Sequence, residues 1–158
     1  MIIRLILTLI LFAVPGLAQQ YAAEFSAGAD ASTTPHTYGS FAVLAGNGST
    51  SSYTKFMARG PNEGLPRFNY GVLTGIRQNL FKYALGPRRG TVFTDVQGGV
   101  TPSADAVSGA VTGGGGVTIT LFKAVNLVIG GRASYAPADG GLRPDIQIGI
   151  QLRPEVVP

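Results

Sequence analysis

The chain has 158 residues, of which 45% are hydrophobic and only 13% are charged, with a formal net charge of +4. This apolar content excludes a disordered low-complexity chain, and the charged fraction is about half the usual share of a soluble domain. The 23 glycines disfavour long helices, and the absence of cysteine with a single histidine excludes disulfide scaffolds and Cys- or His-rich metal sites. The length predicts one domain, and the basic residues are scattered along the chain without the footprint of a nucleic-acid-binding protein. We expect no cofactor and no metal site.

The first residues have the layout of a secretory signal peptide. A positive start at Arg4 precedes the apolar run of residues 5–14, and Gly16 and Ala18 provide the small side chains that a signal peptidase reads. The run would span only about half of a ~30 Å hydrocarbon core, which disfavours a membrane anchor. We predict a signal peptide over residues 1–18 and a mature domain over residues 19–158.

The first three predicted strands follow the signal peptide and alternate between apolar and polar side chains, which indicates two different faces. In the first strand, Glu24 occupies the polar face and Phe25 the apolar face. Asn47 and Gly48 separate the second and third strands and both tolerate positive φ, so they predict a tight hairpin turn. These strands cover residues 21–30, 38–45 and 52–59.

The fourth and fifth predicted strands continue the same alternation. Arg77 lies on the polar face of the fourth strand and Asp95 on the polar face of the fifth, while Ile76 and Val96 lie on the apolar faces. A connection over residues 82–89 is predicted between them. The two strands cover residues 68–80 and 91–100.

The last three predicted strands include the most regular segment of the chain. Arg132 lies on the polar face of the seventh strand and Asp145 on that of the eighth. In the eighth strand, every second residue is a large aliphatic one, and the residues between them are polar or glycine. These strands cover residues 116–122, 126–135 and 145–153.

Eight short strands without an amphipathic helix predict an all-β fold, either a closed barrel or a sandwich. Of these we expect the barrel, with eight antiparallel strands in up-and-down order. Two arrangements fit: a soluble lipocalin-like barrel that binds an apolar ligand, and an outer-membrane barrel with its apolar face toward lipid. The second is favoured because the polar face carries few charges and many glycines, which suit a narrow interior. It predicts a charge network across the lumen and a lipid-facing row on the last strand. The network comprises Glu24, Arg77, Asp95, Arg132 and Asp145, and the row comprises Ile146, Ile148, Ile150 and Leu152.

The predicted connections differ in length between the two ends of the barrel. With the N-terminus in the periplasm, three connections lie on the periplasmic side, and two of these are tight turns. The four on the other side are each seven or more residues long, as is expected of outer-membrane barrels. The long connection over residues 82–89 breaks this rule. The periplasmic connections are 47–48, 82–89 and 123–124, and the outer ones are 31–37, 60–67, 101–107 and 136–143.

Residues 113–122, the turn at Lys123 and residues 126–135 resemble a strand pair that recurs in porin-like outer-membrane β-barrel domain proteins. The resemblance is best over residues 91–153 and weaker over 21–60. It implies a cell outer membrane location, with outer-membrane lipid and the outer-membrane insertion machinery as partners, and we expect a monomer. In that family the final strand is the assembly signal; Gln147, Gly149 and Leu152 match it, whereas Pro154 and the lack of a terminal aromatic residue depart from it.

Catalytic motifs are weak in this sequence. Some eight-stranded outer-membrane barrels are lipid-modifying enzymes that use a histidine with a serine and an acid at the outer rim, and His36 has Ser32, Ser40 and Asp30 nearby. The His-x-Ser spacing of one such family is absent, which favours a loop histidine in water. The glycines at 113–116 lack the Lys-Ser/Thr of a phosphate-binding loop and fit a barrel wall. We therefore predict a side-chain-filled barrel with a structural or surface-binding role and no catalytic residue; a lipid-modifying enzyme is the least favoured alternative.

Overall fold

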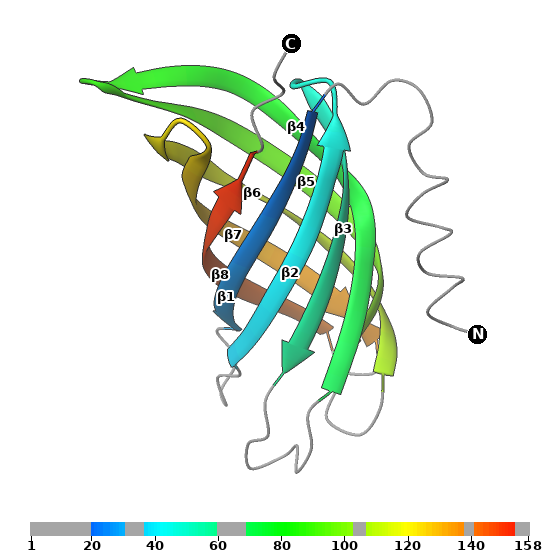
Figure 1. The fold of residues 1–158 in the computed structure, drawn as a ribbon. Coiled ribbons are helices and arrows are strands. Elements are labelled where there is room, and N and C mark those ends of the chain that lie inside the picture. The colour runs from blue at the N-terminus through cyan, green and yellow to red at the C-terminus, as the bar shows by residue number, and fades with distance from the viewer. Residues whose placement is uncertain (1–19, 31–36, 60–68, 103–106, 138–140, 154–158) are drawn as a thin grey trace.

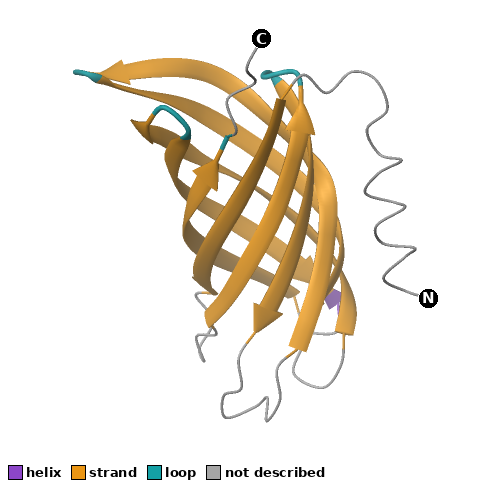
Figure 2. Cartoon of the chain, viewed as in Figure 1, coloured by secondary structure: helices purple, strands orange, loops and turns teal. Residues whose placement is uncertain are grey.

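The computed structural model describes residues 20–30, 37–59, 69–102, 107–137 and 141–153, and all structural statements concern these ranges. They form eight antiparallel strands that close into a barrel (Figures 1 and 2). The strands are β1 (Gln20–Asp30), β2 (Thr37–Gly46), β3 (Thr50–Arg59), β4 (Asn69–Leu85), β5 (Arg88–Pro102), β6 (Val107–Phe122), β7 (Val125–Ala136) and β8 (Gly141–Leu152).

Each strand pairs with its neighbours in the chain, and β1 pairs with β8 from Ala23 opposite Leu152 to Asp30 opposite Asp145. This closed up-and-down order confirms the predicted fold class. Closure also satisfies the backbone groups of the first and last strands, which an open sheet would expose. No helix among the described residues is long and apolar enough to cross a membrane. The predicted signal peptide lies outside the described residues and remains a prediction.

Three tight turns and both ends of the described barrel, Gln20 and Leu152, lie at one end of the molecule, called here the turn end (Figure 1). Gly48 and Gly86 have positive φ values of 89° and 58°, which glycine adopts without steric strain. At the β2–β3 turn, the Asn47 side chain accepts hydrogen bonds from the backbone N–H groups of Ser49 and Thr50. The other ends of the eight strands lie at the opposite end of the molecule, and residues 31–36, 60–68, 103–106 and 138–140 between them fall outside the described ranges.

The predicted long connection over residues 82–89 is wrong. β4 continues to Leu85 and β5 begins at Arg88, so only Gly86 and Pro87 form the turn. The register shifts between Asn79 and Phe81, which marks a β-bulge. A bulge reverses the alternation of faces, and this explains why the period-two pattern ends early in the sequence. With the correction, all three connections at the turn end are tight.

The predicted start of the sixth strand at residue 116 is also wrong, because β6 begins at Val107. The glycines at 113–116 lie within the strand and pair with β5 on one side and β7 on the other. Glycine is depleted in strands, which is why propensity missed this segment. Pairing on both sides holds the glycines in place despite their low propensity.

The distribution of charged and apolar side chains between interior and exterior is the reverse of that in a soluble protein. Charged residues line the interior, where nine-tenths or more of each of Glu24, Lys55, Arg77, Asp95 and Arg132 is buried. Large apolar side chains of every strand except β3 are exposed on the outside. This arrangement contradicts the lipocalin-like alternative, in which the charged face would meet water.

Candidate functional site

A cluster of charged and polar side chains from six strands fills the middle of the barrel, and we call it the lumen cluster. The closed, tilted strands bring residues that are far apart in sequence to a common centre. Cations and anions balance when Asp145 at its edge is included, three of each. Its members are Glu24 from β1, Tyr53 and Lys55 from β3, Arg77 from β4, Asp95 from β5, Arg132 from β7 and Gln147 from β8.

Arg77 connects two acids in this cluster. Its Nη1 donates to Glu24 Oε2 at 2.7 Å, and its Nη2 lies 3.5 Å from Asp95 Oδ2. The guanidinium also stacks on two rings, 4.5 Å from the centroid of Tyr53 and 4.1 Å from that of Phe93. Cation–π contacts of this kind strengthen when water is excluded. Arg77 is therefore fixed by both charge and packing.

Arg132 forms the most complete ion pair with Asp95. Its Nε donates to Asp95 Oδ1 at 3.1 Å and its Nη2 to Asp95 Oδ2 at 2.9 Å, a two-bond geometry that fixes both side chains. Its Nη1 donates to Gln147 Oε1, which also accepts a hydrogen bond from Lys55 Nζ at 2.9 Å. Gln147 Nε2 in turn donates to Glu24 Oε1 at 3.1 Å. One hydrogen-bonded network thus joins the two arginines, the two acids and the lysine.

Glycines on β6 make room for this network. In the strand register, Gly114 lies between Asp95 of β5 and Arg132 of β7. A Cβ atom on Gly114 would lie 2.6 Å from Arg132 Cγ, so only glycine lets the arginine cross β6 to its acid. Gly116 similarly lies under the ring of Phe93, which stacks on Arg77. Gly114 and Gly116 therefore leave the space that the side chains of Arg132 and Phe93 occupy inside the barrel.

Asp145, the fifth predicted network residue, belongs to a separate group nearer the end of the barrel opposite the turns. It accepts a hydrogen bond from Tyr38 Oη at 3.0 Å and another from Ser134 Oγ at 3.4 Å. Close by, Arg59 Nη2 pairs with Asp30 Oδ2 at 2.5 Å. The structure therefore brings Glu24, Arg77, Asp95 and Arg132 together directly and leaves Asp145 beside them.

Sequence reasoning missed Tyr53, although it lies at the centre of the cluster with no exposed surface. Its hydroxyl donates to Glu24 Oε1 at 3.2 Å and accepts from Arg132 Nη2 at 3.4 Å. The signal was present, because Tyr53 shares a strand face with Lys55 and not with Phe56. An aromatic residue with a hydroxyl can fill a narrow polar interior that an aliphatic side chain would leave unsatisfied.

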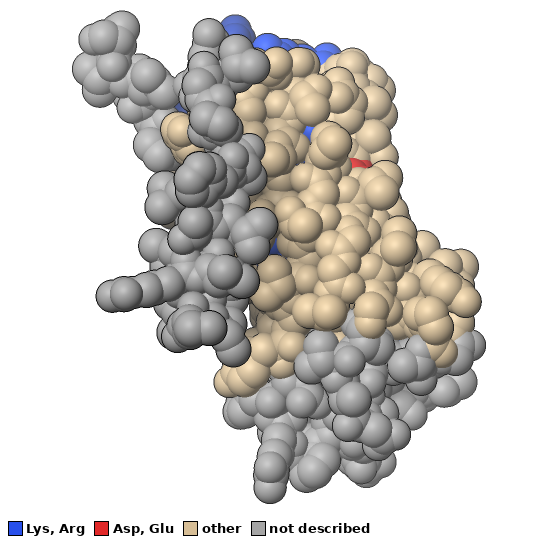
Figure 3. Space-filling model, turned by 90° about the vertical axis from the view of Figure 1, so that its right-hand side faces the viewer, with Lys and Arg blue, Asp and Glu red and all other residues tan. Residues whose placement is uncertain are grey.

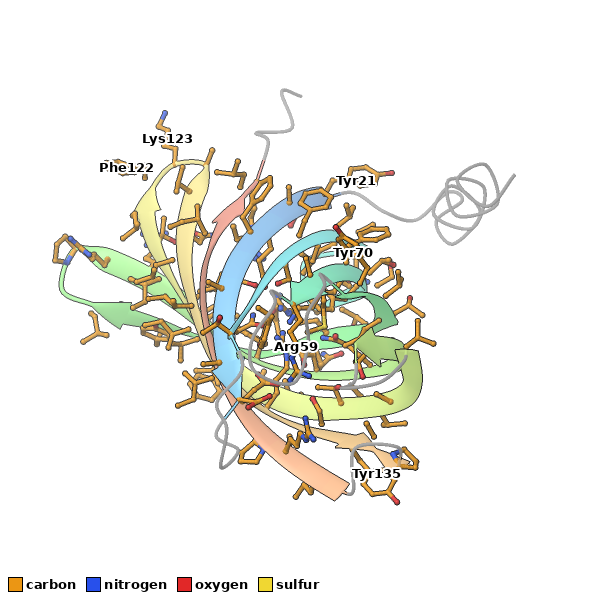
Figure 4. All side chains as sticks on the ribbon, turned by 90° about the horizontal axis from the view of Figure 1, so that it is seen from below. Tyr21, Arg59, Tyr70, Phe122, Lys123 and Tyr135 are labelled. Carbon is orange, nitrogen blue, oxygen red and sulfur yellow. The ribbon has the colours of Figure 1, made fainter. Side chains whose placement is uncertain are left out.

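The outer wall is the second candidate surface. Along the strands, none of the described outward-facing residues between the two ends is charged, and the wall in Figure 3 is almost free of blue and red. The predicted row on β8 faces outward, with Ile146 68% and Ile148 55% exposed; Ile150 and Leu152 continue it. Exposed aromatic residues lie near both edges of this wall. By their positions in the strands, Tyr21 and Phe122 lie at the turn end and Tyr70 and Tyr135 at the other end. Their side chains are labelled in Figure 4, which looks at the barrel from below. An apolar band between aromatic edges is typical of transmembrane barrels.

Catalytic and metal chemistry finds little support among the described residues. His36 lies outside them, Ser40 Oγ shares a hydrogen bond of 2.6 Å with Ser26 Oγ, and Asp30 pairs with Arg59. No group of three His, Cys, Asp or Glu side chains in the described part of the chain could hold a metal ion. The contacts of the lumen cluster pair its charges and bury them away from water.

Comparison with known proteins finds solved structures that are similar to this chain. Neisserial surface protein A (NspA) matches with a TM-score of 0.58 and 12% sequence identity, over 87% of this chain and 98% of that one. A de novo designed transmembrane β-barrel matches with a TM-score of 0.52 and 10% identity, over 89% and 99%. The N-terminal barrel domain of Pseudomonas aeruginosa OprF has a TM-score of 0.48 and 12% identity, over 84% and 96%. No family model and no curated protein sequence matches the chain.

The first two matches, the closed topology and the apolar wall together show that the chain has the fold of a small eight-stranded outer-membrane barrel. The two matched structures are covered almost completely, so the likeness extends over the whole barrel. At 10–12% identity it concerns the fold alone.

Proposed function

We propose that this protein is a non-conducting barrel of the Gram-negative outer membrane with a structural role in the envelope. The observation that carries the proposal is the closed interior: nine-tenths or more of each lumen-cluster side chain is buried, and the charges are paired across the barrel. Eight strands leave an interior just wide enough for side chains to fill. No enzymatic step is part of the proposal.

The sizes of the interior cavities support a barrel that neither conducts nor stores a ligand. A cavity of about 50 Å³ lies toward the end opposite the turns, lined in part by Tyr38 and Arg59, and one of about 20 Å³ lies at the turn end beside Gln151. Ligand pockets for small molecules are about 300–1,000 Å³. These cavities are large enough only for a few water molecules, and the lumen cluster separates them.

Surface binding is the second candidate function. The strand ends that lead into the four predicted outer connections lie at the end opposite the turns, and an outer-membrane barrel exposes its loops at that end. The matched NspA is by name a surface protein, which supports the same general role here. We also propose that the barrel is a monomer assembled by the outer-membrane insertion machinery, since β1 and β8 close it without a second chain.

Cell fractionation followed by electrophoresis with and without heating tests the membrane proposal. We expect the mature chain in the outer-membrane fraction, soluble only in detergent, with faster migration before heating than after. Planar-bilayer recording of the purified protein tests the closed interior, and we expect no steady conductance. Recovery in the periplasmic or secreted fraction without detergent would refute the membrane location, whereas stable channels would refute the closed interior alone.

A further inference from the structure

Two hairpins extend beyond the barrel wall at the turn end (Figures 1 and 4). β3 pairs with β4 only as far as Gln78, and β6 pairs with β5 only from Gly90 onward. Residues 80–85 and 88–89 therefore pair with no third described strand and form a hairpin that extends past the wall, where the Tyr83 hydroxyl donates to Thr118 O of β6 at 3.0 Å. The shorter β6–β7 hairpin, with its turn at residues 123–124, extends from the same end.

The β4–β5 hairpin is amphipathic. After the bulge at Leu80, Phe81 pairs with the outward-facing Val92, so Phe81 and Leu85 continue the apolar outer wall, 60% and 65% exposed. Lys82 lies on the opposite side of the hairpin. Arg88 and Arg89 lie at its tip, beside the turn, and both are exposed.

The β6–β7 hairpin repeats this combination independently. Phe122 is 71% exposed and precedes the exposed Lys123 at the tip, and both side chains project from the hairpin in Figure 4. Each hairpin thus presents an aromatic side chain next to cations. Lysine and arginine beside apolar groups suit the boundary between hydrocarbon and headgroups, where the stem is buried and the charge reaches the polar layer.

Charge at the turn end has a single sign among the described residues. The exposed cations are those of the two hairpins, and the described acids face the barrel interior. On the face shown in Figure 3, the blue side chains gather at the upper edge, which is the turn end. The exposed cations are Lys82, Arg88, Arg89 and Lys123, and the interior acids are Glu24, Asp30, Asp95 and Asp145.

The length of β4 indicates that these hairpins lie at the depth of the lipid headgroups. On β4, the eleven residues from Tyr70 to Leu80 cross about 25 Å at the usual strand rise and tilt, which is the height of the apolar band of such barrels. Phe81 then lies at the boundary, and the cations of the hairpin lie just outside it. Each Lys or Arg near an anionic lipid surface contributes about 1 kcal/mol of attraction, which raises the binding constant about fivefold.

We infer that the two hairpins at the turn end bind the anionic headgroups of phospholipids in the adjacent leaflet. Lys82, Arg88, Arg89 and Lys123 contact the phosphates, and the neighbouring apolar side chains lie at the top of the acyl chains. The inference rests on the membrane location proposed above. It assigns to this end of the barrel a preference for anionic over zwitterionic phospholipid.

The absence of tryptophan in the chain allows a direct test. Phe81→Trp and Tyr70→Trp place one probe at each end of the same strand, in the full mature protein reconstituted in phosphatidylcholine vesicles. A minor share of the lipid is brominated, either phosphatidylglycerol or phosphatidylcholine, and tryptophan quenching is compared. For the Phe81→Trp probe, we expect the quenching to report a preference for phosphatidylglycerol over phosphatidylcholine of at least about fivefold, which is the effect of one cation. For the Tyr70→Trp probe, we expect the two brominated lipids to quench equally.

Replacing Lys82, Arg88, Arg89 and Lys123 with glutamine should abolish the preference at the Phe81→Trp probe, and added salt should weaken it in the parent. Equal quenching by the two lipids, or a preference that survives the glutamine replacements, would overturn the inference. Phe122→Trp provides a second probe if the first variant does not fold. If brominated phosphatidylcholine quenches neither end, the membrane location itself fails, and the two failures are thereby distinguished.

Discussion

Replacing Arg132 with methionine removes the most connected cation of the lumen cluster. Methionine fills similar space, so the main loss is the two-bond pair with Asp95 and the hydrogen bonds to Gln147 and Tyr53. Among the described residues, the one ion-pair partner left to Asp95 would be Arg77, whose Nη2 lies 3.5 Å away. The variant therefore leaves a carboxylate in a site that is almost inaccessible to water.

The magnitude follows from this burial. Arg132 is 5% exposed and Asp95 is 1% exposed, so solvent screens neither charge. Removing one partner of a buried pair costs about 3–5 kcal/mol, because the other charge is left uncompensated. Converting Asp95 to asparagine in the same chain removes that charge while Glu24 keeps its pair with Arg77. The double variant should recover about 2–3 kcal/mol relative to additivity.

Urea unfolding of the barrel refolded into vesicles measures these free energies, with heat-modifiable gel mobility reporting the folded fraction. Arg132→Met, Asp95→Asn and their combination form one double-mutant cycle. Asp30→Asn provides the control cycle with Arg132→Met, because Asp30 forms its ion pair with Arg59 and Arg132 forms its own with Asp95. Its coupling should stay below about 0.5 kcal/mol. Strict additivity in the Asp95 cycle, or equal coupling in the two cycles, would refute the pairing.

Three further predictions concern packing and the outer wall. Gly114→Ala should destabilise the barrel by about 1–3 kcal/mol because its Cβ would overlap the Arg132 side chain, whereas Gly113→Ala on the same strand has open space and should change little in the same urea titration. Tyr53→Phe keeps the ring but removes the donor to Glu24, and should cost about 1–3 kcal/mol; an unchanged unfolding midpoint would show that the hydroxyl is dispensable. Ile148→Arg should cost about 2–4 kcal/mol near the bilayer midplane and Leu142→Arg near the rim only about 0–1 kcal/mol, so equal losses would contradict the assigned depth.

The period-two pattern predicted the strands and their faces because alternation is a local property of the backbone. It placed Arg77 and Asp95 on the polar faces, and both point inward. It failed where the alternation is broken, as at the bulge near Leu80, and where side chains are missing, as in the glycines at 113–116. In both places the structure is determined by pairing with the neighbouring strands. The alternation of residues along one strand does not reveal this pairing.

The partners inside the barrel could not be predicted for a related reason. Sequence reasoning left Glu24, Asp95 and Asp145 as equal candidates for Arg132, because the stagger between strands decides which acid is in reach. In the structure, Gly114 opens the path to Asp95, while Asp145 is held by Tyr38 and Ser134. The alternation of residues predicts that the interior is polar, but the register between the strands determines which acid pairs with which arginine.

The central claim is that the apolar face of the barrel meets lipid and the charged face is enclosed. The chain contains no cysteine, so single cysteines can be introduced at each position from 145 to 152 of β8 and spin-labelled in vesicles. The account predicts that labels at Ile146, Ile148 and Ile150 collide readily with oxygen dissolved in lipid and poorly with a water-soluble nickel complex, while labels at Gln147 and Gly149 collide poorly with both. Ready collision of the nickel complex with labels at the isoleucine positions would show that this face meets water and would contradict the account.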